Sequence, residues 1–173
     1  GWQVGDVYVL DLGFNPAGAL LGHVKLEFIA LEGNTLTIRY AQLNGSDEHT
    51  GTITKIELYN NVSYSFATHE SLITEPPKDQ WDIAFTQYTN IFYEPFTPYL
   101  VTGVLINPYN VAVAVDSVTP FLNITNQGVE GHTYSTVLDA IGYAWKVYSL
   151  EESVYTVYPD FVYLIKDTEG LYY

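Results

Sequence analysis

Two runs of alternating apolar and polar residues flank a Gly-Asn turn in residues 23–41, HVKLEFIALEGNTLTIRYA. The apolar residues recur at every second position: Val24, Leu26, Phe28, Leu36, Ile38 and Tyr40. Side chains of a strand alternate between its two faces, so this period places one face of each run on a core. A Gly-Asn pair between two such runs predicts a β-hairpin.

The same pattern continues on both sides of this hairpin. Further strands are predicted at residues 7–10, 52–58, 62–66, 81–88, 100–106, 111–115, 144–148, 153–157 and 162–166. Residues 90–98 and 116–131 are predicted to be loops, and residues 136–141 the one short helix. The chain is therefore expected to be all-β, with mostly antiparallel sheets in a sandwich-like or twisted arrangement.

Aromatic residues are abundant, with 16 Tyr, 8 Phe and 3 Trp. Aromatic side chains favour strands because they fit a pleated, half-buried surface. A Tyr ring also packs while its hydroxyl stays hydrated, which suits a surface that stacks on a ligand. Both interpretations remain open from composition alone.

The charge balance is strongly acidic, with 20 Asp and Glu against 6 Lys and Arg and a net charge of −14. The six cations are scattered along the chain. Nucleic-acid binding and docking on anionic lipid both need clustered Lys and Arg, so neither is expected.

Cys and Met are both absent from the sequence. There is accordingly no disulfide, thiol nucleophile or Cys-based metal site. The chain does not begin with Met, so we expect a processing or cloning boundary before Gly1. A return strand begins just before Tyr173, so we expect further residues beyond that position. No apolar run approaches the roughly 20 residues of a membrane-spanning helix.

Catalytic motifs are missing as well. The sequence holds no phosphate-binding glycine loop, no H-E-x-x-H and no G-x-S-x-G. Its four His lie far apart, at positions 23, 49, 69 and 132, and Gly103 and Gly142 stand alone. We expect a binding protein and not an enzyme, with a hydrolase built on paired carboxylates as a distant alternative.

Five segments in order carry a family resemblance. They are YSF at 64–66, DQWDIAFTQY at 79–88, VTGVL at 101–105, AIGYAWKVY at 140–148 and VYLIKDTEG at 162–170. Residues 79–88 resemble the W-D-hydrophobic-A-hydrophobic-x-x-Y signature of the HmuY family of haem-binding proteins, and residues 162–170 resemble the closing hairpin of that family. The resemblance covers about residues 52–173.

The resemblance implies a domain over residues 51–173, with residues 1–50 as an N-terminal hairpin extension. It implies a secreted protein or outer-membrane surface lipoprotein of a Gram-negative bacterium. Such a protein binds haem noncovalently and passes it to a TonB-dependent receptor. An alternative is a surface module of the same fold that binds a protein or glycan after losing haem ligation.

The resemblance also suggests where haem would bind. The best-known members coordinate iron through two His, but this chain has Ser149, Leu150 and Glu151 where one of them is expected. His132 lies near the other, and His and Tyr both ligate haem iron, so His132 and Tyr134 are the candidate iron-binding pair. Aromatic residues at loop or loop-edge positions are candidates for the ligand surface, namely Tyr99 and Tyr109, together with Tyr93 and Phe96. Trp81 and Trp145 are expected to be core residues.

Overall fold

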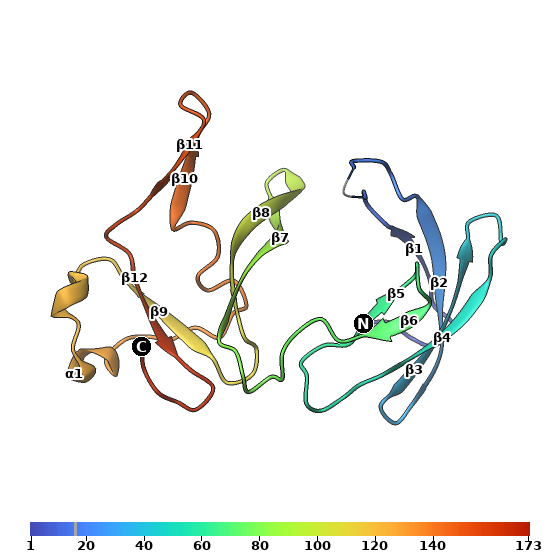
Figure 1. Ribbon diagram of the computed structural model, residues 1–173, viewed down its shortest axis with the longest axis horizontal. Coiled ribbons are helices and arrows are strands. Elements are labelled where there is room, and N and C mark those ends of the chain that lie inside the picture. Colours follow the sequence, from blue (N-terminus) through green and yellow to red (C-terminus); the bar gives the residue numbers. More distant parts are fainter. Residues whose placement is uncertain (16) are drawn as a thin grey trace. The chain divides into compact units, whose positions relative to one another are not determined.

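The computed structural model describes residues 1–15 and 17–173, which form two compact units, Gly1–Pro76 and Pro77–Tyr173 (Figure 1). The boundary expected from the sequence, between residues 50 and 51, falls inside a strand of the first unit. The two units instead separate between Pro76 and Pro77. Consecutive prolines supply no backbone N–H for strand pairing, which explains why neither sheet continues through them.

The first unit is built on a four-stranded antiparallel sheet with the strands in chain order. These strands are β1 (Val7–Asp11), β2 (His23–Glu32), β3 (Thr35–Gln42) and β4 (His49–Thr54). The predicted β2–β3 hairpin is confirmed, because Leu26 pairs with Tyr40 and Phe28 with Ile38 across it. A short hairpin of β5 (Ser63–Ser65) and β6 (Glu70–Leu72) completes the unit.

The core of the first unit lies between this sheet and the small hairpin. Leu26, Ile38 and Tyr40 are buried, and Tyr64 and Phe66 pack against them. The Tyr40 hydroxyl is hydrogen-bonded to Nδ1 of His69 at 2.6 Å and to the Tyr64 hydroxyl at 3.2 Å. Burial, reinforced by the bond with Tyr64, raises the pKa of Tyr40 far above its usual value. The phenol therefore stays protonated, and it links β3 to the small hairpin.

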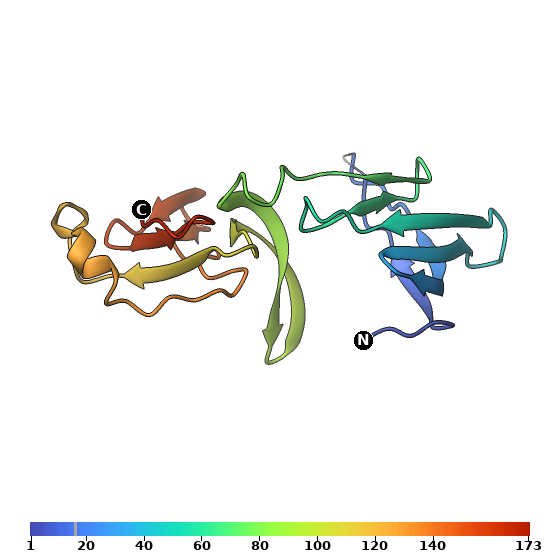
Figure 2. The same cartoon turned by 90° about the horizontal axis from the view of Figure 1, so that it is seen from below.

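The second unit contains three strand pairs, all antiparallel. Its longest is the hairpin of β7 (Ile83–Tyr93) and β8 (Phe96–Ile106), which Figure 2 shows as a curved ribbon. The strand β9 (Ala112–Asp116) pairs with β12 (Val162–Lys166), although the two are distant in the chain. The third pair is the hairpin of β10 (Lys146–Ser149) and β11 (Val154–Val157).

Two groups of buried residues form the core of the second unit. The first comprises Val104, Ile106, Val111, Val113 and Ile141, with Trp145 among the partly buried residues packed on it. The second comprises Ala114, Val129, Val162 and Leu164. Trp81 and Trp145, both expected to be core residues, are half-buried, and Trp145 packs on the first group.

The expected all-β class is confirmed, and two local expectations are wrong. Residues 90–98 are not a loop, because β7 and β8 stay paired up to Tyr93 and Phe96. Residues 136–141 form turns, and the one α-helix described is the four-residue α1 (Asn126–Val129), which follows the 3₁₀ turn η1 (Phe121–Asn123). Thr125 begins α1 because its side chain accepts the N–H of Gly128. No described helix has the length and apolarity needed to cross a bilayer.

Two glycines allow β8 to approach the segment before β10. Val104 N donates to Gly142 O at 2.8 Å, and Gly142 N donates to Val104 O at 3.0 Å. A Cβ at residue 103 would lie 2.5 Å from Gly142 O, a distance that real side chains do not adopt. Gly142 itself has φ of +64°, which favours glycine. The pair fixes residues 143–146 against the long hairpin.

Replacing Tyr40 by Phe should lower the free energy of unfolding of the first unit by about 1 kcal/mol, since the ring stays and His69 and Tyr64 lose a buried partner. Urea unfolding followed by circular dichroism measures this. The control is Tyr8→Phe, because the Tyr8 hydroxyl bonds Asp6 at the surface. Equal losses in the two variants would contradict a structural role for the buried hydroxyl.

Replacing Gly103 by Ala should destabilise the second unit by about 1–3 kcal/mol, because the added methyl meets the backbone of Gly142. Gly128→Ala is the matched control, since a Cβ there meets only Thr125 Oγ1 at 3.5 Å. Thermal unfolding of both variants tests this. A Gly103→Ala protein as stable as the control would show that the two segments do not approach this closely.

Candidate functional site

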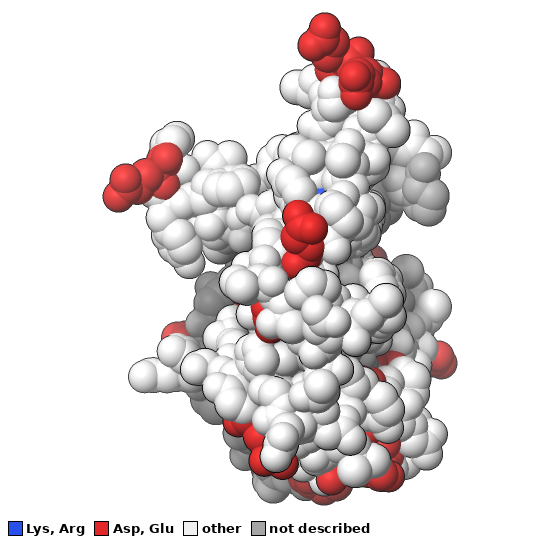
Figure 3. All heavy atoms as spheres, turned by 90° about the vertical axis from the view of Figure 1, so that its left-hand side faces the viewer, with Lys and Arg blue, Asp and Glu red and all other residues white. Residues whose placement is uncertain are grey.

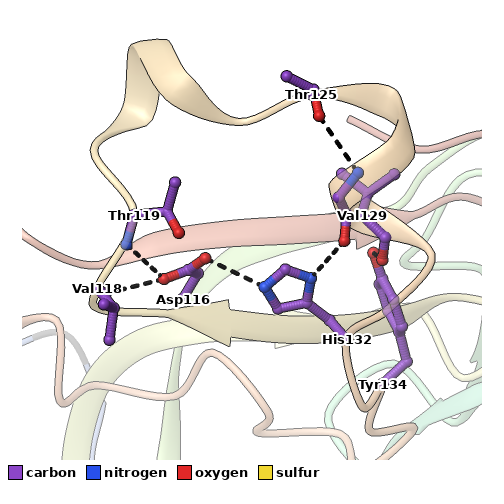
Figure 4. A network of polar contacts seen from close by, with 8 residues as sticks. Asp116, Val118, Thr119, Thr125, Val129, His132 and Tyr134 are labelled. Carbon is purple, nitrogen blue, oxygen red and sulfur yellow. Dashed lines mark hydrogen bonds and ion pairs between the residues drawn. The ribbon is translucent and has the colours of Figure 1, made fainter.

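His132 lies in a network of hydrogen bonds beside α1 (Figure 4). Its Nδ1 is 3.0 Å from the carbonyl oxygen of Gly128, and its Nε2 is 3.1 Å from Oδ2 of Asp116. A carbonyl oxygen and a carboxylate only accept hydrogen bonds, so each ring nitrogen of His132 faces an acceptor oxygen of the protein itself. In this arrangement His132 ties α1 to the end of β9.

Asp116 is the buried partner in this network. Its Oδ1 accepts the backbone N–H groups of Val118 and Thr119, each at 2.8 Å. These bonds, Thr119 foremost, hold the pKa of the Asp116 carboxyl far below its usual value, and His132 adds to the effect. The carboxylate therefore remains charged and keeps His132 in place.

Tyr134 is engaged in the same region. Its hydroxyl donates to the carbonyl oxygen of Val129 at 3.1 Å, and its ring packs 5.5 Å from that of Tyr172. Burial, with a contribution from Tyr172, raises the pKa of the Tyr134 phenol. Because Tyr ligates iron as a phenolate, this environment opposes coordination. The structure thus places His132 and Tyr134 near α1, with their polar atoms hydrogen-bonded to other residues of the protein.

Tyr109 and Tyr99 lie elsewhere in the unit. Tyr109 follows β8, with Nζ of Lys78 4.7 Å from its ring centroid. Tyr99 belongs to β8 itself, is 59% exposed, and faces Phe92 with ring centroids 6.2 Å apart. The predicted site residues therefore lie in three separate places, and Tyr99 is the one that lines a solvent-facing hollow.

This hollow, which we name the tyrosine hollow, has a volume of about 340 Å³ and is lined by both hairpins of the second unit. Strands β7 and β8 contribute Phe92, Tyr99, Leu100, Val101 and Thr102, and the β10–β11 side contributes Tyr143, Lys146, Val147, Tyr148 and Tyr155. Tyr148 pairs with Tyr155 across that hairpin, with ring centroids 4.9 Å apart. A hollow of this size lies within the range of small-molecule sites.

Lys146 introduces a positive charge into the tyrosine hollow. Its Nζ lies 4.7 Å from the ring centroid of Trp145 and 4.6 Å from that of Tyr155. Both distances are within the range of cation–π attraction, so the two rings hold the ammonium group in position. It is the one Lys or Arg among the described residues that line this hollow.

A further depression, the apolar hollow, also has a volume of about 340 Å³. Its lining is almost wholly apolar and comprises Ile83, Phe85, Val104, Ile141, Trp145, Val157, Tyr158, Phe161, Tyr163 and Ile165. Phe85, in the motif that carries the family resemblance, is 74% exposed here. The buried Nε1 of Trp145 has no hydrogen-bond partner among the described residues. Buried donors are usually paired, so this nitrogen is an exception among the described residues.

The first unit holds a cluster that the spacing of the His residues did not predict. The rings of His49 and His69 stack with centroids 3.8 Å apart, although His49 begins β4 and His69 lies in the turn between β5 and β6. His49 Nε2 lies 2.9 Å from Oδ1 of Asp47, and His69 bonds Tyr40. Within the described residues no three His, Cys, Asp or Glu side chains are placed to hold a metal ion. The stacked rings bring the turn between β5 and β6 against the start of β4.

Comparison of the chain with protein-family models, curated proteins and solved structures finds no match. The likeness to the HmuY family therefore rests on the five segments quoted above. Two of them, residues 101–105 and 140–148, meet in space at the Val104–Gly142 contact and contribute to both hollows.

The low pKa of Asp116 predicts a pH dependence of stability. A carboxyl with a depressed folded pKa stabilises the fold fully above its unfolded value, near 3.8, and loses this contribution as the pH falls further. Asp116→Asn should therefore be less stable than wild type at pH 6, and the difference should shrink below about pH 4. Urea unfolding across this range measures it, with exposed Asp160→Asn as control. A difference independent of pH would contradict the charged role of Asp116.

Proposed function

We propose that the second unit binds a flat, largely apolar ligand of the tetrapyrrole class, with haem as the ligand, in the tyrosine hollow. The observation that carries this proposal is the set of aromatic rings that two separate hairpins present to one solvent-facing hollow. Tyr99 and Tyr155 are each more than half exposed. A planar ligand that stacks on solvent-exposed rings buries their apolar area, which favours binding.

The affinity should come mainly from contacts between the face of the porphyrin and the Tyr rings of the hollow. Stacking on Tyr99, Tyr148 and Tyr155 requires no bond to iron, and His132 and Tyr134 have their polar atoms bonded within the protein. A metal-free porphyrin should consequently bind nearly as well as haem. This distinguishes the proposed mode from the two-His coordination that the family resemblance implies.

The wider biological role follows from the same resemblance. A haemophore-like protein, secreted or anchored at the outer-membrane surface, would take up haem in the tyrosine hollow and release it to a TonB-dependent receptor. Binding through ring faces favours such transfer, because release of haem from the hollow then requires no iron–protein bond to be broken.

A different candidate function is a surface module that binds a protein or glycan. The observation that favours it is the engagement of both candidate iron ligands in the α1 network. The tip of the long hairpin also exposes Tyr93 and Phe96, and aromatic anchors of this kind dominate many protein interfaces.

Titration of the protein with haemin and with metal-free protoporphyrin IX, followed in the Soret region, tests the primary proposal. Both should give a saturable shift in wild type. Tyr99→Ala and Tyr155→Ala should each weaken binding by about tenfold, as expected for loss of one stacked ring. Phe121→Ala, which removes an exposed ring outside the hollow, is the matched control and should leave affinity unchanged.

The variant His132→Ala separates the two binding modes. Unchanged haemin affinity in this variant supports binding through the tyrosine hollow, whereas a large loss seen with haemin and not with the metal-free porphyrin would assign His132 to iron. Absence of a saturable shift with either compound would discard the tetrapyrrole proposal and leave the surface module.

A further inference from the structure

The charge of the tyrosine hollow differs from that of the rest of the chain. The protein carries a net charge of −14. Figure 3 shows acidic side chains gathered at projecting tips and at the lower end of the face that it draws, where Lys and Arg scarcely appear. An anionic ligand approaching such a molecule is repelled, so its recognition depends on a local positive group.

Lys146 is such a group, and its position is fixed by its neighbours. The Trp145 and Tyr155 rings hold the ammonium group on the β10–β11 hairpin. A Lys side chain free in solvent loses considerable rotamer entropy when it binds a ligand. Contacts that already restrict the side chain reduce that loss and make Lys146 effective as an anchor.

The remaining lining supplies no counter-charge. Among the described residues that form the tyrosine hollow, the others are aromatic, aliphatic or hydroxyl side chains, without Asp or Glu. A ligand that covers these rings removes water from around the ammonium group. That desolvation is unfavourable unless the ligand itself brings a negative oxygen to Nζ.

We propose that Lys146 selects a ligand with a carboxylate at the edge of its ring system, so that the tyrosine hollow binds a porphyrin diacid in preference to the neutral ester. This inference rests on the proposed tetrapyrrole function and names the part of the ligand that the protein recognises. The ring faces supply affinity for either form, and the ammonium group discriminates between them through a charge-assisted hydrogen bond.

The test compares protoporphyrin IX with its dimethyl ester, in one buffer and cosolvent, on wild type and two variants. Wild type should bind the diacid about tenfold more tightly than the ester, the scale of one exposed charge-assisted hydrogen bond. Lys146→Met should abolish this preference while keeping the affinity for the ester. Lys146→Arg, which retains the charge, should keep most of the preference for the diacid.

Lys166→Met is the matched control, since Nζ of Lys166 lies over the Tyr172 ring at 5.8 Å and away from the hollow. Circular dichroism verifies the fold of each variant. Equal affinity of wild type for diacid and ester, or a preference that survives in Lys146→Met, overturns the inference and leaves the tetrapyrrole function standing. Failure of both compounds to bind wild type overturns the proposed function, and the inference with it.

Discussion

The second unit depends on the close backbone contact between β8 and the segment before β10. Two reciprocal hydrogen bonds join Val104 to Gly142, and a side chain at residue 103 would prevent them. This contact places Tyr143, Trp145 and Lys146 beside the long hairpin. Without it the two hairpins would each expose an aromatic face, but they would share neither hollow. Aromatic side chains line the proposed site, and Gly103 and Gly142 allow the close approach that brings them together.

The sequence predicts the local elements of this protein better than its long-range contacts. The period-two pattern of residues 23–41 predicts the β2–β3 hairpin because pairing and burial there are both local. Residues 90–98 mislead because a segment rich in Pro and aromatic residues is typical of a loop, whereas a strand at the edge of a two-stranded hairpin tolerates Pro. The helix is predicted at residues 136–141 instead of at α1 for a related reason. The Thr125 cap and the contact between His132 and the carbonyl oxygen of Gly128 stabilise α1, and apolar periodicity reveals neither.

Prediction of the candidate site is limited in the same way. His132 and Tyr134 are the right residue types for iron, but their polar atoms bond neighbours that only the fold places there. Tyr99 emerges from sequence as an aromatic residue in a supposed loop, and the structure places it in a strand that lines the tyrosine hollow. Tyr155 and Lys146 give no signal in the sequence, because their significance depends on a distant hairpin brought alongside β8. The residues that look reactive in the sequence are hydrogen-bonded to neighbours in the fold, and residues without a sequence signal line the tyrosine hollow.

The three Trp residues are divided between the two units in a way that has an optical consequence. Trp2 stacks on Phe28 in the first unit, with ring centroids 4.4 Å apart, whereas Trp81 and Trp145 belong to the second. The ammonium group of Lys146 lies over the Trp145 ring, which also lines the apolar hollow, so Trp145 emission should change when either hollow is occupied. Replacing Trp2 by Phe would leave fluorescence that reports on the second unit alone. The protein thus contains an intrinsic reporter for each half, and the two halves can be observed separately in the intact chain.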